Sequence, residues 1–442
     1  MTKPVSTPVN TPVNTPVNTP VNNLEKIRKS LGRRNRSEQL FRWYGRLAIL
    51  IGLAAVTVLF TDIVSKGHGA FRISYMQLEV EYDQDLIGVD NLTDPEQLIL
   101  GNWQAVPKQA LRQQFPDVSG RSDKRKLYGL VSNGSGFDLK DRLLANPLLL
   151  GTRETVWILA DDDIDSYYKS WLDGEPYAAR LSEKQVQWIS ELHDQGKIRL
   201  QFNSNLFTRG DSREPEQAGI RGAVMGSLFT LLLTLMLSFP IGVAAAIYLE
   251  EFAPKNGWTD FIEVNINNLA AVPSIIFGLL GLAIFINFFH VPRSVPIVGG
   301  LVLTLMTLPT IIITSRAAIK SVPPSIREAA LGMGASKYQM VLHHVLPLAL
   351  PGMLTGAIIG MAQALGESAP LLMIGMVAFI VDIPGGFSDP ATVLPVQIFL
   401  WADSPERAFI EKTSAAIMVL LSFLIVMNTS AVWLRKRLER RW

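Results

Sequence analysis

The chain has 442 residues, 48% of them hydrophobic, and its mean hydropathy is positive. This is high for a soluble protein and low for a bundle of membrane helices alone, so we expect a membrane part and a polar domain. The net charge of +2 singles out no class of partner, whereas the absence of cysteine excludes disulfides and zinc–thiolate sites. The first apolar run begins near Leu47, so we expect no cleavable signal peptide.

The N-terminal stretch predicts a tail followed by a membrane anchor. Residues 7–22 repeat Thr-Pro-Val-Asn four times, and a proline at every fourth position prevents a helix. Basic residues follow from Lys26 to Arg46, so we expect residues 1–46 to be a disordered, basic tail. Residues 47–65 are apolar and are predicted to form the first transmembrane helix. Basic flanks of a span stay in the cytoplasm, which explains this charge without a nucleic-acid partner.

Residues 66–219 have a different composition, with frequent charges and no run long enough to span a membrane. Alternation of apolar and polar residues predicts strands at 71–82 and 198–202, and the pattern predicts helices at 139–150 and 181–192. We therefore expect an inserted α/β domain on the outer side. Its polar loop at 132–136 carries no catalytic signature, because Gly-x-Ser-x-Gly and His-Glu-x-x-His are both missing, and we expect neither catalysis nor a metal site.

Residues 220–442 contain five more apolar segments. We predict spans at 220–249, 266–289, 297–319, 348–376 and 415–434, with Pro- and Asp-containing residues 381–412 as an outer loop. Six spans in all predict an all-α polytopic membrane protein with both termini in the cytoplasm. Basic residues after the last span, from Arg435 to Arg441, agree with this orientation.

Hydroxyl side chains recur on one face of two of these spans. One stripe is made of Ser227, Thr230, Thr234 and Ser238, and the other of Thr304, Thr307, Thr310 and Thr314, with Arg316 near the inner end of the second. Ser and Thr pack closely at helix interfaces in membranes, and they can also line a polar pathway. Both interpretations stay open, and Thr307, Thr310, Thr314 and Arg316 are candidate pathway residues.

The segment from 320 to 347 lies between two spans but is polar where it begins. Arg327, Glu328 and Lys337 could not be buried in a bilayer, where each charge costs roughly 2.5–3.5 kcal/mol on insertion scales. Ala329 and Ala330 favour a helix, and the glycines at 332 and 334 suit its C-terminal turn. We therefore predict a short helix on the cytoplasmic side.

This segment resembles the EAA loop of ABC importer permeases. The similarity rests on Glu328-Ala329-Ala330, on Gly334 after three intervening residues, and on Leu346-Pro347, although the family prefers an aliphatic residue where this chain has His344. In that family the loop is a coupling helix that docks into a groove on the ATPase subunit. The resemblance implies this role for Arg327, Glu328, Ala329, Ala330, Gly334, Leu346 and Pro347.

The fifth predicted span contains a polar site. Gln363, Glu367 and Ser368 interrupt an otherwise apolar segment, and an ionisable residue in a span indicates function. A helix would place Gln363 and Glu367 on the same face, since they are four residues apart. The alternative is structural: Glu367 pairs with a basic residue on a partner helix and holds the bundle together.

The sequence from Gly366 to Leu372, Gly-Glu-Ser-Ala-Pro-Leu-Leu, sharpens the resemblance. It is similar to the Gly-Glu-Thr-Ala-Pro-Leu-Leu of phosphate-specific permeases of the PstA type, which often have arginine where this chain has Gln363. The resemblance implies an importer of inorganic phosphate in the bacterial inner (plasma) membrane, with no cofactor on this chain. It also implies three kinds of partner: a second homologous permease subunit, two ATPase subunits and an extracytoplasmic phosphate-binding protein.

Other functions were weighed against this one. Gly196-Lys197 is the only Gly-Lys pair and lacks the P-loop pattern, so we expect no ATP site here. An importer of sulfate or molybdate is the nearest alternative. A proton-coupled secondary transporter using Glu367 would leave the EAA pattern unexplained. A sensor would need a signalling domain, and none is apparent.

Overall fold

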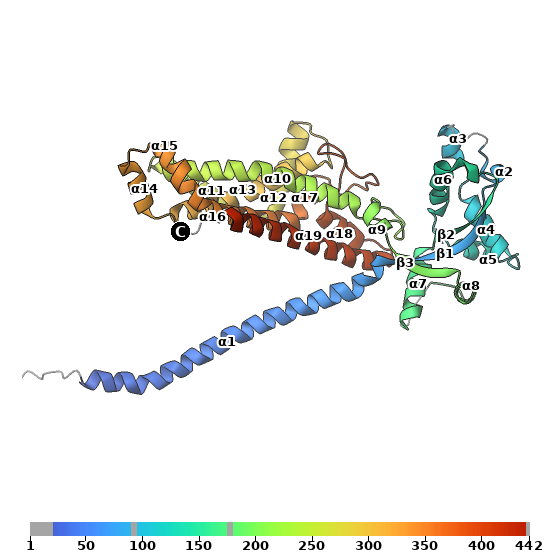
Figure 1. Ribbon diagram of the computed structural model, residues 1–442, viewed down its shortest axis with the longest axis horizontal. Helices are drawn as coiled ribbons and strands as arrows, with labels where there is room; N and C mark the ends of the chain where they lie inside the picture. The colour runs from blue at the N-terminus through green and yellow to red at the C-terminus, as the bar shows by residue number, and fades with distance from the viewer. Residues whose placement is uncertain (1–20, 90–94, 175–179, 439–442) are drawn as a thin grey trace, which may run out of the picture. The chain divides into compact units, whose positions relative to one another are not determined.

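The computed structural model describes residues 21–89, 95–174 and 180–438 (Figure 1). The first helix, α1, runs from Val21 to Gly67, and a candidate membrane span covers Leu31–Phe71. The prediction of a disordered tail is therefore wrong for residues 21–46, which are helical. The last proline of the repeat is Pro20, and Leu, Lys, Arg and Glu beyond it favour a helix. Residues 7–20 of the repeat lie outside the described residues.

A small α/β domain follows α1 and is built on a three-stranded antiparallel sheet in the order β2-β1-β3. β1 (Arg72–Glu81) is central, between β2 (Arg153–Leu159) and β3 (Ile198–Phe202). Along β1 the alternate residues Met76, Leu78 and Val80 are buried and form a core with the surrounding helices. This is the period-two burial of a strand with one covered face.

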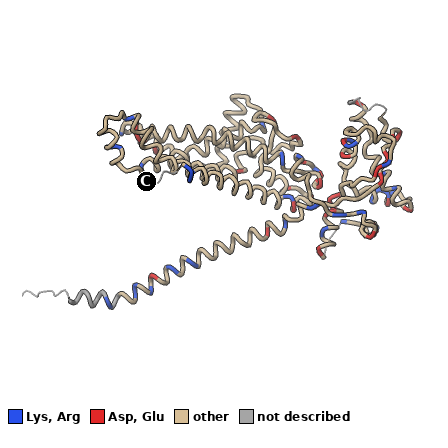
Figure 2. Tube along the Cα trace, viewed as in Figure 1, with Lys and Arg blue, Asp and Glu red and all other residues tan. Residues whose placement is uncertain are grey.

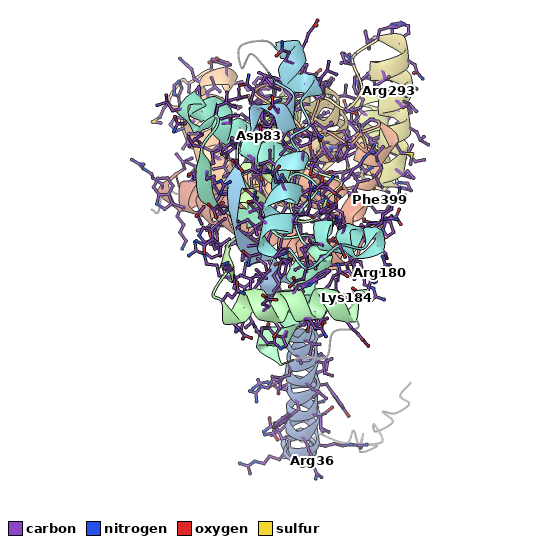
Figure 3. All side chains as sticks on the ribbon, turned by 90° about the vertical axis from the view of Figure 1, so that its right-hand side faces the viewer. Arg36, Asp83, Arg180, Lys184, Arg293 and Phe399 are labelled. Carbon is purple, nitrogen blue, oxygen red and sulfur yellow. The ribbon has the colours of Figure 1, made fainter. Side chains whose placement is uncertain are left out.

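The helices of this domain connect and cover the sheet. Figure 3 looks onto the domain and labels Asp83, which caps one of these helices, and Lys184 in the first turn of another. In chain order the helices are η1 (His68–Phe71), α2 (Gln84–Ile87), α3 (Pro95–Leu100), α4 (Ala105–Gln114), α5 (Arg121–Tyr128), α6 (Ser135–Ala145), η2 (Pro147–Leu149), α7 (Asp162–Asp173), α8 (Glu183–Asp194) and α9 (Asn205–Thr208). The predicted strands and helices agree with β1, β3, α6 and α8, whereas β2 was not predicted.

The remaining chain is helical. In Figure 2 charged residues are sparse along these helices and gather near their ends and on the α/β domain. The helices are α10 (Arg221–Ile247), η3 (Tyr248–Phe252), α11 (Gly257–Ala270), α12 (Ser274–Gly281), η4 (Leu282–Phe288), α13 (Pro296–Lys320), α14 (Pro324–Gly332), α15 (Lys337–Met340), η5 (Val341–Val345), α16 (Leu346–Gly366), α17 (Ala369–Met373), α18 (Leu394–Ala402) and α19 (Ala408–Leu438). Within the described residues, five helices are long and apolar enough to cross a membrane, or six if one bent pair is a span.

The bent pair corrects the third predicted span. Gly257–Ala270 and Ser274–Phe288 are both helical, but they meet at an angle of 101°. Pro273 lies at the break, where it cannot donate a backbone hydrogen bond to a continuing helix. The predicted straight helix over 266–289 is therefore two segments. The predicted outer loop at 381–412 likewise contains the helix α18 and the beginning of α19.

The fifth predicted span is also shorter than expected. α16 ends at Gly366, Glu367 is extended with φ −83° and ψ 121°, and the chain resumes as the short helix α17. Gly375 then takes a left-handed φ of 90°, which favours glycine. The predicted helix over 348–376 is thus interrupted at its polar site.

Candidate functional site

The segment between α13 and α16 forms a short helix with recognisable ends. α14 begins at Pro324, where the missing N–H of proline is tolerated, and ends at Gly332. Gly334 follows with a left-handed φ of 89°, a conformation that stops the helix and favours glycine. In α15 the side chain of Ser336 accepts a hydrogen bond from the backbone N–H of Gln339, which caps the next turn. The predicted short helix at the EAA motif is therefore present.

Arg327 fixes α14 to the helices beside it. Its Nη2 lies 2.8 Å from Oε1 of Glu251, and its Nε donates to the same oxygen at 3.1 Å. The guanidinium also donates to the backbone carbonyls of Val322 at 2.6 Å and Ile319 at 2.9 Å. These four hydrogen bonds from the Arg327 side chain hold the beginning of α14 against the ends of α10 and α13.

The opposite face of α14 is open. Ala330 is buried against a core that includes Ala246, Ile319 and Val345, whereas Glu328 and Ala329 are exposed. Leu331 and Met333 are also exposed, and Met333 shows 78% of its surface. A short helix with small and apolar residues on its free face offers a surface to which a second protein could bind.

Arg316 is a second basic residue that forms ion pairs at the same end of the helix bundle. Arg316 on α13 lies 2.6 Å from Glu263 on α11 and 3.4 Å from Glu250 on η3, and Lys320 lies 3.5 Å from Glu250. These ion pairs explain why Glu250 and Glu251 follow an apolar helix: both carboxylates compensate arginines that arrive from later helices. A pathway role for Arg316 stays a prediction, since these contacts by themselves give it a structural role.

The polar site in the fifth span lies at a helix break. Glu367 is half-buried at the end of α16, and Ser368 is half-buried beside it. Within the described residues no ion pair or side-chain hydrogen bond engages the Glu367 carboxylate. Gln363 is exposed on the last turn of α16. Because the helix stops at Gly366, the expected i,i+4 relationship between Gln363 and Glu367 does not exist.

The hydroxyl stripes lie at helix interfaces. Thr307 is buried and donates to the carbonyl of Leu303 at 2.9 Å, and Thr314 donates to that of Thr310 at 2.7 Å. A Cβ on Gly356 of α16 would lie 1.9 Å from the Thr314 hydroxyl, so these helices approach closely because a glycine faces a threonine. This geometry favours packing, and the pathway role of Thr307, Thr310 and Thr314 stays a prediction.

A buried polar cluster joins the α/β domain to α19, and no sequence pattern predicted it. Lys169 lies 2.7 Å from Asp165 and 3.1 Å from Glu411. Lys412 is buried and donates to the carbonyl of Ala218 at 2.5 Å. Although burial opposes the charge of Lys169, its pKa is raised, because Asp165 and Glu411 outweigh that effect. The partners are up to 242 residues apart, so no local pattern could have revealed them.

Glu216 belongs to this cluster. It accepts a hydrogen bond from the hydroxyl of Ser132, in the loop that the sequence singled out, while its other oxygen is buried without a partner. Burial raises the pKa of Glu216 to about 7, and repulsion from Asp162 and Glu214 adds to the shift. Burial and the neighbouring Asp162 likewise raise the pKa of Asp161 to about 8. Burial therefore favours the protonated forms of Glu216 and Asp161.

The chain matches two known families. Residues 238–442 match "Binding-protein-dependent transport system inner membrane component", and residues 28–176 match a domain of unknown function, DUF3333. The first match contains α14 and the break at Glu367. The second covers α1 and most of the α/β domain.

Curated relatives match about half of the chain. "Probable ABC transporter permease protein YqgI" of Bacillus subtilis is 31% identical over 53% of this chain and 83% of that protein. "Phosphate transport system permease protein PstA" of Haemophilus influenzae is 27% identical over 51% of this chain and 78% of that protein. A chain in the structure "Inward facing conformations of the MetNI methionine ABC transporter: CY5 native crystal form" has a TM-score of 0.42 and 18% identity over 50% of this chain and 96% of that chain. The expected permease family is confirmed: the chain belongs to the binding-protein-dependent inner membrane components and is a non-catalytic permease subunit of an ABC transporter.

Proposed function

We propose that this chain is the membrane-spanning subunit of an ATP-driven importer of inorganic phosphate. The carrying observation is the helix break at Glu367, which falls within the Gly366–Leu372 sequence that resembles phosphate-specific permeases. Similarity to the phosphate permease proteins of Haemophilus influenzae and Yersinia pestis supports the same substrate. The chain would lie in the inner (plasma) membrane of a bacterium with both termini in the cytoplasm.

ABC permeases work with ATPase subunits, a partner permease and a binding protein. For this chain we propose a second homologous permease subunit, two ATPase subunits and an extracytoplasmic phosphate-binding protein. The exposed face of α14, with Glu328, Ala329 and the turn at Gly334, would dock on one ATPase. Arg327 would transmit the movement of α14 to α10 and α13 through its bonds to Glu251, Val322 and Ile319. Leu346 and Pro347, the first two residues of α16, would fix the position of α16 relative to α14.

The break at Glu367 would form part of the translocation pathway. A carboxylate repels a phosphate anion strongly where the dielectric constant is low, so Glu367 is not a phosphate ligand. A half-buried carboxylate in a membrane protein requires pairing, water or a proton. Because this chain supplies no partner within the described residues, we propose that Glu367 holds a basic residue of the second permease subunit. Gln363 and Ser368 would lie beside that pair as neutral hydrogen-bonding groups.

The substrate is tested by uptake into vesicles that contain all subunits and ATP. Labelled phosphate should accumulate, and unlabelled phosphate should compete fully. Sulfate and molybdate in large excess should not compete. Accumulation of sulfate or molybdate without phosphate would identify another oxyanion as the substrate while leaving the permease assignment intact.

A further inference from the structure

Three phenylalanines form a stacked group on the α/β domain, in which Phe202 and Phe207 are exposed and Phe71 is half-buried. Phe202 ends β3, Phe207 lies in α9, and Phe71 ends η1. The rings of Phe71 and Phe207 are 6.0 Å apart and nearly parallel, and so are those of Phe207 and Phe202. Phe202 exposes 66% of its surface and Phe207 40%. Two adjacent exposed rings stacked on a half-buried third form a patch, unlike a single exposed leucine, which needs no explanation.

This patch lies where the chain leaves and re-enters the membrane. Phe71 is the last residue of the candidate span Leu31–Phe71, and the span of α10 begins at Arg221, shortly after Phe207. The backbone N–H of Asn203 donates to the carbonyl of Phe71 at 2.8 Å, so the end of β3 is tied to the end of the span.

Buried neighbours join the same place to α18 and to the beginning of α19. Ala70 and Leu206 belong to a buried cluster with Trp401 of α18 and Phe409 of α19, and Phe71 packs against that cluster. α19 itself is a candidate span. The patch is therefore continuous with the ends of helices whose length and composition suit a bilayer.

A free arginine completes the patch. Arg72 faces Phe202 across the β1–β3 pair, so the two side chains project from the same face of the sheet. Arg72 is exposed, and within the described residues no carboxylate lies within ion-pair distance of it. Aromatic rings with an adjacent cation have the chemistry of a surface that contacts lipid, because the rings enter the apolar boundary and the cation meets phosphate groups.

We propose that Phe71, Arg72, Phe202 and Phe207 rest on the lipid headgroup layer and hold the α/β domain against the membrane. The stack extends from the end of a span, so Phe207 reaches the lipid beside Phe71 and Phe202 lies next along the surface. Arg72 contacts the phosphate groups of the lipid. This inference needs only that the chain spans a membrane, and it holds whichever anion is transported.

The test uses the absence of cysteine from the chain. A single cysteine at Ser204, an exposed residue between Phe202 and Phe207, leaves all three rings in place and can carry an environment-sensitive fluorophore. The matched control is Leu148→Cys, at an exposed apolar residue in η2. The full chain is reconstituted in bilayers containing lipids with a spin label at the headgroup. Emission at 204 should be quenched at least several-fold more than emission at 148.

A second series tests the patch residues themselves. Phe202→Ser combined with Phe207→Ser, in the Ser204→Cys background, should reduce lipid quenching at 204 to the level at 148. Arg72→Gln should reduce quenching more in vesicles with anionic lipid than in neutral vesicles. Equal quenching at 204 and 148 in the otherwise unchanged chain would overturn the proposal. A probe at 204 shielded from both lipid-borne quencher and aqueous iodide would overturn it as well, since a protein would then cover the patch.

Discussion

Arg327 and Glu251 join two helices that are far apart in the sequence. The guanidinium of Arg327, in α14, meets the carboxylate of Glu251, in η3, at 2.8 Å, and the Glu251 side chain is only 8% exposed. The EAA motif begins at the next residue, Glu328. One ion pair therefore attaches the exposed helix α14 to η3, which directly follows the α10 span.

Breaking this connection should uncouple transport from ATP hydrolysis. Arg327→Gln leaves Glu251 buried without its cation, at a cost on the order of 1–3 kcal/mol. We expect phosphate uptake to fall at least tenfold while the subunits still assemble. Arg327→Glu combined with Glu251→Arg should recover part of the uptake. The control is Lys320→Gln, because Lys320 is 60% exposed and its ion pair is worth little. Normal uptake by Arg327→Gln would show that the pair does not couple.

The exposed face of α14 is tested by charge reversal. Glu328→Lys should abolish uptake by weakening the docking of the ATPase, whereas the activity of the isolated ATPase should be unchanged. Glu328→Gln removes the charge without reversing it and should give an intermediate result. Co-purification of the ATPase with each variant measures docking directly. If Glu328→Lys binds the ATPase and transports like the parent chain, α14 is not the docking element.

A substitution at Glu367 distinguishes a functional role of this residue from a structural one. Glu367→Gln keeps the size and hydrogen bonding of the side chain and removes its charge. We expect an assembled complex whose phosphate uptake is reduced at least tenfold, because the basic residue of the partner subunit would lose its counter-ion. The structural alternative predicts dissociation of the two permease subunits. Assembly and uptake are measured on the same preparation, and intact assembly with undiminished uptake contradicts both.

Glu216 predicts a pH dependence of stability. Its pKa rises from an ordinary value of 4.5 to about 7, so the folded state holds this proton more tightly than the unfolded state. Stability then falls as pH rises from about 4.5 to 7 and levels off above, by on the order of 3 kcal/mol. Glu216→Gln can still accept the Ser132 hydroxyl and avoids this loss.

Thermal unfolding of the full chain at pH 5 and pH 8 checks this prediction. The midpoint of Glu216→Gln should exceed that of the parent chain more at pH 8 than at pH 5. Asp161 and Asp162 shift in the same direction, so part of the dependence should remain. The exposed Asp173→Asn should follow the parent profile. Equal differences at both pH values would mean that Glu216 is not the titrating group.

Sequence patterns within one segment predicted the helices and strands whose formation depends mainly on the residues of that segment. The apolar runs placed α10, α13, α16 and α19, and the glycines at 332 and 334 marked the end of α14. Alternation along β1 identified a strand with one covered face. The helix break at Glu367 was not predicted, because Gly366 and Pro370 were interpreted as residues within one helix and not as the sign of its end.

Ion pairs and hydrogen bonds between residues far apart in the sequence were not predicted, for a different reason. Glu251 directly follows an apolar span, but its partner Arg327 lies 76 residues later. Lys412 reads as a polar residue near the beginning of a span, and only the fold places it under Ala218. Such pairs depend on how helices pack, which no periodicity within one helix encodes.

The energy source of transport tests the central claim most directly. Vesicles containing every subunit are supplied either with ATP and no ion gradient, or with a proton gradient and no ATP. Labelled phosphate should accumulate only with ATP, and collapse of any gradient should leave the rate unchanged. Accumulation driven by the proton gradient without ATP would contradict the account, and would make Glu367 a proton carrier in a secondary transporter.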